Sequence, residues 1–76
     1  MREIMIALSN TVRMLDIQLD IINHDIEMLD DIIEIDNGRL DIKLEKCYKH
    51  VIRLKLIEYK KSFLDTIALQ RKAEKE

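Results

Sequence analysis

LSNTVRMLDIQLDIINHDIEMLDDII, residues 8–33, repeats large apolar residues at alternating spacings of four and three without a gap. Residues at these spacings fall along one line of an α-helix, and a sustained heptad is typical of a helix that packs lengthwise on another helix. We therefore predict one long helix whose seam packs within the chain and across a dimer. The seam residues are Leu8, Val12, Leu15, Leu19, Ile22, Ile26, Leu29 and Ile33.

A second apolar line runs along the same helix at Ala7, Met14, Ile21, Met28 and Ile35. The combined apolar arc is wider than one helix–helix contact covers, so this helix should need more than one neighbour. A chain of 76 residues is also near the lower size limit for one stable core. We therefore predict a homodimer that forms a four-helix bundle or coiled coil, with the parallel and antiparallel arrangements of the two hairpins both open.

Asn37-Gly38 marks the predicted chain reversal. Extending the heptad further would place Lys43 and His50 in the seam, which argues against one uninterrupted coiled coil. Gly38 is the only glycine, and glycine readily adopts the left-handed conformation that ends a helix. We therefore predict a turn at residues 37–39 between helices at about 2–36 and about 40–73.

A β-hairpin is the alternative at this place, because apolar and polar residues alternate on both sides of Asn-Gly, a pair that favours tight β-turns. Such a hairpin would set Glu34 opposite Asp41, and like charges at facing positions destabilise a sheet. Ile33 also completes the helical seam. We therefore predict an all-α fold, an antiparallel helical hairpin of two long amphipathic helices that forms a single domain, residues 1–76.

The C-terminal half carries two apolar lines. The first is Leu40, Leu44, Cys47, Val51 and Leu54, and the second is Ile52, Leu56, Tyr59, Phe63 and Ile67. Either this helix changes its packing partner midway, or it breaks near Ser62, which with Asp65 three residues later resembles a helix N-cap. We favour a continuous helix. Because Cys47 falls on an apolar line, we expect its thiol to be buried as a small apolar group.

Composition and charge restrict the class of protein. One cysteine permits no intrachain disulfide, and no apolar run is long enough for a signal peptide or a membrane span, so we expect a cytoplasmic protein without membrane contact. Residues 1–37 hold nine Asp/Glu against two Arg, whereas residues 38–76 hold eleven Lys/Arg against six Asp/Glu. Opposite charge on the two halves suits antiparallel helices of one hairpin.

No pattern in the sequence indicates catalysis. Five polar residues share one face of the first helix and could in principle hold a cation, namely Asp20, His24, Glu27, Asp31 and Glu34. This face lies opposite the seam, where carboxylates are usually solvated. Cys47 and His50 form only half of a zinc site, and a two-helix rod lacks a pocket that excludes water. We therefore predict a non-enzymatic protein with no cofactor and no metal.

A basic stripe on the second helix is the candidate binding surface. Its predicted residues are Lys46, Lys49, Arg53, Ile57, Lys60 and Leu64. Lysine and arginine along a rod can neutralise phosphates of RNA or DNA, but no aromatic platform accompanies them. Apolar residues inside a ring of charges also suit a protein interface.

The predicted function is that of a small regulatory or adaptor protein, an inhibitor or an assembly factor, which acts on another protein. The composition resembles that of viral and plasmid accessory proteins. Two alternatives remain. One is an RNA- or DNA-binding dimer that uses the basic stripe, and the other is a purely structural coiled-coil element.

Overall fold

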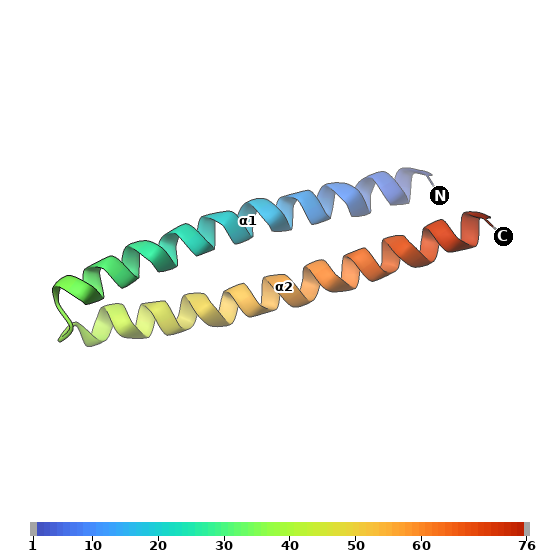
Figure 1. Cartoon of the computed structure of the whole chain (residues 1–76). Helices are drawn as coiled ribbons and strands as arrows, with labels where there is room; N and C mark the ends of the chain where they lie inside the picture. The colour runs from blue at the N-terminus through green and yellow to red at the C-terminus, as the bar shows by residue number, and fades with distance from the viewer. Residues whose placement is uncertain (1, 76) are drawn as a thin grey trace.

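The computed structural model describes residues 2–75 and has two long helices, α1 (Arg2–Ile35) and α2 (Leu40–Lys75) (Figure 1). The helices lie side by side in antiparallel orientation, with the start of α1 and the end of α2 at one end of the rod and the turn at the other. The rod measures 59 × 14 × 13 Å. The predicted all-α helical hairpin is confirmed, and the described residues contain no strand, which makes the β-hairpin alternative wrong. Met1 and Glu76, the ends of the predicted domain, lie outside the described residues.

Helix α1 packs on α2 along the heptad line. Ile22, Ile26 and Leu29 are buried, and the other five seam residues are half-buried. Burial is deepest in the half of α1 nearer the turn, since all three buried positions lie there. A two-helix rod has a core only one side chain thick, so these few positions contribute most of the apolar stabilisation within a single chain.

Helix α2 turns one line of residues toward α1. Ile42, Ile52, Leu56 and Phe63 are half-buried, and Ile67 is buried. The first apolar line of this helix, Leu40 to Leu54, faces solvent along its whole length. Cys47 lies on that line and is exposed, so the expected buried thiol is wrong for the single chain. The second apolar line of α2 faces α1 only in part, because its member Tyr59 is exposed.

Helix α2 runs without interruption through Ser62. The Thr66 hydroxyl donates a hydrogen bond to the Ser62 carbonyl oxygen at 2.9 Å, four residues back along the helix. The favoured continuous helix is therefore confirmed, and the break near Ser62 does not occur. Neither helix is long and apolar enough over its described residues to cross a membrane.

The turn forms without a left-handed residue. No described glycine has a positive φ, so the conformation expected of Gly38 is wrong. Instead, the Gly38 N–H donates to Asp36 Oδ1 at 3.2 Å, and the Asp36 N–H donates to the Ile32 carbonyl oxygen at 2.9 Å. An aspartate side chain that accepts a bond from the backbone two residues on is a common way to close a turn.

An ion pair marks the start of α2. Arg39 Nε and Nη2 donate to Oδ1 and Oδ2 of Asp41 at 3.1 and 2.9 Å. These hydrogen bonds lower the pKa of Asp41 and raise the pKa of Arg39. A lowered carboxyl pKa contributes stability above the value in the unfolded chain, so this contribution is present at neutral pH and is lost as the pH falls through the lowered pKa.

We expect Ile22→Ala to destabilise the protein by about 2 kcal/mol or more, because it removes buried methyl and methylene groups from a thin core. The control is Leu54→Ala, which removes the same number of carbons from a side chain 59% exposed. Urea denaturation followed by circular dichroism measures both. Equal loss of stability in the two variants would contradict the assigned packing of α1.

We expect Gly38→Ala to be neutral or to stabilise the protein by up to about 1 kcal/mol, because alanine reduces the conformational entropy of the unfolded chain. A Cβ at this position would meet only Asp36 Oδ1, at 3.4 Å, which is ordinary van der Waals contact. Asp36→Ala is the contrasting variant and should destabilise, since the Gly38 N–H loses its acceptor. A clear loss of stability in Gly38→Ala would indicate a left-handed turn residue.

Candidate functional site

A ladder of polar pairs joins the two helices along one broad side of the hairpin. Lys60 Nζ lies 2.6 Å from Asp16 Oδ1, Arg53 Nε donates to Asn23 Oδ1 at 2.8 Å, and Lys46 forms an ion pair with Asp30. On each helix the three partners are seven residues apart, so each set follows one line of its helix. We call this side the charged face, and it also includes Ile57 and Leu64.

The ladder neutralises much of the predicted basic stripe within the chain. The charged heads of Lys46 and Lys60 lie against carboxylates of α1, and the Arg53 guanidinium is bonded to an amide oxygen. The side chains of both lysines are about one-third exposed, 31% and 34%, so their alkyl stems cover the seam while their heads reach its edge. The basic stripe is thus an edge of the α1–α2 contact.

Two apolar side chains of the charged face remain open to solvent. Ile57 is 40% exposed and Leu64 is 45% exposed. Each follows a ladder residue by four positions, after Arg53 and Lys60, so each lies on the same flank of α2 as the ladder. Ile57 and Leu64 are therefore apolar side chains bordered by ladder residues whose charges are paired within the chain.

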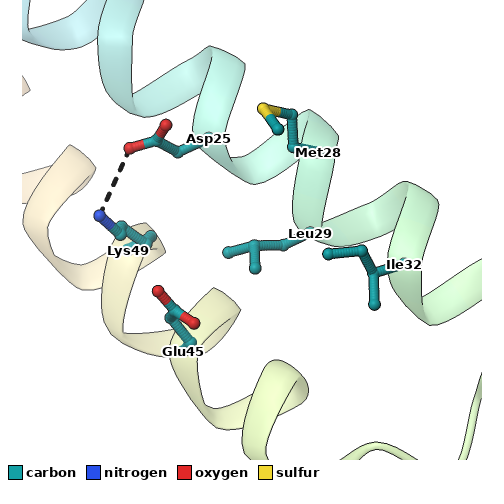
Figure 2. A pocket seen from close by; sticks show the side chains of 6 residues that line it. All are labelled: Asp25, Met28, Leu29, Ile32, Glu45 and Lys49. Carbon is teal, nitrogen blue, oxygen red and sulfur yellow. Dashed lines mark hydrogen bonds and ion pairs between the residues drawn. The ribbon is translucent and has the colours of Figure 1, made fainter.

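Lys49, the sixth predicted residue, is bound from the opposite side of the seam. Its Nζ donates to Asp25 Oδ2 at 3.4 Å (Figure 2). Asp25 and Asp30 are five residues apart on α1, which places them on opposite sides of the buried line. The structure therefore brings five of the six predicted residues to one face and separates Lys49 from them.

The Asp25–Lys49 pair lies in a shallow groove of about 230 Å³ between the helices, lined also by Met28, Leu29, Ile32 and Glu45 (Figure 2). The groove lies on the second broad side of the hairpin, which is largely apolar. We call this side the apolar face. Its exposed large side chains are Met14, Ile21, Met28 and Ile32 on α1, and Tyr48 and Tyr59 on α2.

Sequence periodicity identified only part of the apolar face. Met14, Ile21 and Met28 belong to the second apolar line expected on α1. Tyr48 was not assigned to any surface, although it lies one turn beyond Glu45, which lines the groove. Several lines of α2 contain apolar residues. Which of them lies on the apolar face can be decided only when the side of α2 that packs on α1 is known.

The arrangement offers no metal centre within the part of the chain that is described. No three of its His, Cys, Asp and Glu side chains come close enough to hold an ion. Cys47 and His50 line one depression together, but Lys43 and Lys46 line it too, and two ammonium groups disfavour a cation.

We expect the Asp16–Lys60 pair to contribute about 0.2–1 kcal/mol of coupling, because both groups are partly exposed. A double-mutant cycle with Asp16→Asn and Lys60→Gln measures it, and the coupling should fall in high salt. The matched control is a cycle with Asp20→Asn and Lys61→Gln, whose charges form no ion pair with each other. This control cycle should give no coupling free energy. No salt-sensitive coupling between Asp16 and Lys60 would contradict the ladder.

Comparison of the chain with protein-family models, with curated proteins and with solved structures finds no match. The charged face carries apolar side chains within an ion-paired frame, and the apolar face carries a groove and exposed Met, Ile and Tyr side chains.

Proposed function

We propose that this protein acts without catalysis, as a small cytoplasmic adaptor or regulator that binds another protein through the charged face. The observation that carries the proposal is the position of Ile57 and Leu64. Both are substantially exposed beside a ladder whose charges already have partners in the same chain. Apolar anchors surrounded by polar groups of fixed geometry are the usual composition of a protein interface.

The ladder also bears on nucleic-acid binding, the competing prediction. To hold a phosphate, Lys46 or Lys60 would have to leave a carboxylate of α1, so the gain from each new contact is reduced by the pair that is lost. Neighbouring carboxylates on α1 would repel the phosphates in addition. A protein partner does not require these pairs to open, which is why the charged face supports protein binding better.

The partner's chemistry follows from the same face. It should present apolar side chains to Ile57 and Leu64, and polar groups that can hydrogen-bond to residues already in ion pairs. Because both anchors lie along one helix at a spacing of seven, an extended apolar stripe, such as one side of a helix, would contact both at once. Such an interface is small, and its two anchors should dominate the binding energy.

We expect the double variant Ile57→Glu, Leu64→Glu to lose a protein that the wild-type chain captures from cells that produce it. Burying an unpaired carboxylate at an apolar contact is strongly unfavourable. The matched control is Leu69→Glu, on a side chain 68% exposed and outside the charged face, which should keep the captured protein. Mass spectrometry of the eluates measures both.

Fluorescence anisotropy with labelled RNA and DNA tests the competing prediction. We expect no binding at low salt for the wild-type chain. Binding that falls steeply with salt and disappears in Lys46→Glu, Lys60→Glu would contradict the proposal and favour nucleic acid. If neither the Ile57→Glu, Leu64→Glu variant nor the Lys46→Glu, Lys60→Glu variant changes which proteins are captured, the purely structural alternative is favoured.

A further inference from the structure

We infer that the apolar face is covered by a second copy of this chain, packed face to face with both turns at the same end, so that α1 of each copy lies on α2 of the other. This four-helix assembly goes beyond the proposed function and leaves the charged face of each copy outward. The inference rests on the extent of the apolar face, on the charges of the two helices and on the match of residues along them.

The apolar face needs a cover as broad as the hairpin itself. Its residues lie on both helices, from Met14 to Ile32 on α1 and from Tyr48 to Tyr59 on α2, and the Cα atoms of the hairpin span only 14 × 13 Å across the rod. A single additional helix would cover one helix or the central groove. A second two-helix layer of the same width covers both lines, which is the geometry of a four-helix bundle.

Charge selects which helix lies on which. Residues 1–37, which contain α1, carry a net charge of about −7, and residues 38–76, which contain α2, carry about +5. With the turns at the same end, α1 of one copy lies on α2 of the other, so each helix has only oppositely charged neighbours. With the turns at opposite ends, α1 would lie on α1 and bring two acidic helices together, which is unfavourable.

The positions along the rod also match. In the ladder, residues level with each other on the two helices have numbers that add to 76, as for Asp16 and Lys60. The same level relation applies across copies when both turns lie at one end. Met28 then lies level with Tyr48 of the second copy.

Methionine and aromatic rings pack favourably, so the Met28–Tyr48 level suits a buried contact. This matched level occurs once on each side of the two-fold axis. The residues of the apolar face, which are exposed in the single chain, thereby become buried between the two copies.

The first test is the oligomeric state. Sedimentation equilibrium of the wild-type chain should give twice the 9.1 kDa chain mass, and Met28→Lys should weaken the dimer at least about tenfold. Leu54→Lys is the matched control, because Leu54 is 59% exposed, similar to Met28 at 53%, but lies outside the apolar face. Loss of the dimer in Met28→Lys alone, whether the chain then folds or unfolds, supports the inference.

Two outcomes overturn it. One is a wild-type monomer at the highest soluble concentration, and the other is an equal response of the dimer to Met28→Lys and Leu54→Lys. Neither outcome affects the proposed function, because that proposal is tested on Ile57 and Leu64 with a captured protein. Conversely, if capture of the partner does not depend on Ile57 and Leu64, the proposed function fails and the dimer inference is unaffected.

The second test is the direction of the two copies. A spin label on Asn37→Cys in a Cys47→Ser background places one probe at each turn. Turns at the same end should be about 10–20 Å apart, as for neighbouring helices of a bundle. A distance of more than about 30 Å, as expected if the apolar faces overlap with the turns at opposite ends, would contradict the arrangement.

Discussion

A straight helix can turn only one of its lines toward a neighbour, and this constraint on α2 determines the rest of the structure. In its C-terminal half the line that faces α1 contains Leu56, Phe63 and Ile67, which have no apolar substitute on another line of comparable length. The rotation fixed there holds for the whole uninterrupted helix. The N-terminal half therefore presents Lys46 and Lys49 to α1 between Ile42 and Ile52, although a regular leucine line is available beside them.

The lysines make that orientation tolerable because of what α1 places opposite them. The stems of Lys46 and Lys49 cover the seam, and their heads meet Asp30 on one side and Asp25 on the other. Exposed pairs of this kind are individually weak, so their effect is to make a polar edge acceptable and to fix the axial register. Two consequences follow. The basic stripe is largely neutralised within the chain, and the second apolar line of α1, with Met14, Ile21 and Met28, is left on the apolar face.

The sequence predicted α1 well because its heptad has no competitor: the line from Leu8 to Ile33 is the most regular one on that helix. The turn position followed from the end of this heptad, but its conformation did not, since Asp36 supplies a hydrogen bond that makes a left-handed glycine unnecessary. On α2 the most regular line was misleading, and Cys47 was misplaced with it. Apolar periodicity does not register the alkyl stems of lysines, although these stems can cover a seam. Which line of α2 packs on α1 also depends on the side chains that α1 places opposite it. The members of the basic stripe could be named from the sequence, whereas the ion pairs of its lysines require the register between the helices.

The reactivity of the Cys47 thiol tests the orientation of α2 most directly. This residue lies on the leucine line and outside both faces, so it is exposed in a single hairpin and in the inferred four-helix assembly alike. Its rate of reaction with a small disulfide reagent in the native protein should lie within a factor of about three of the rate in the urea-unfolded chain. Protection of about a hundredfold or more would mean that the leucine line is buried, and the account of the fold and of both faces would be contradicted.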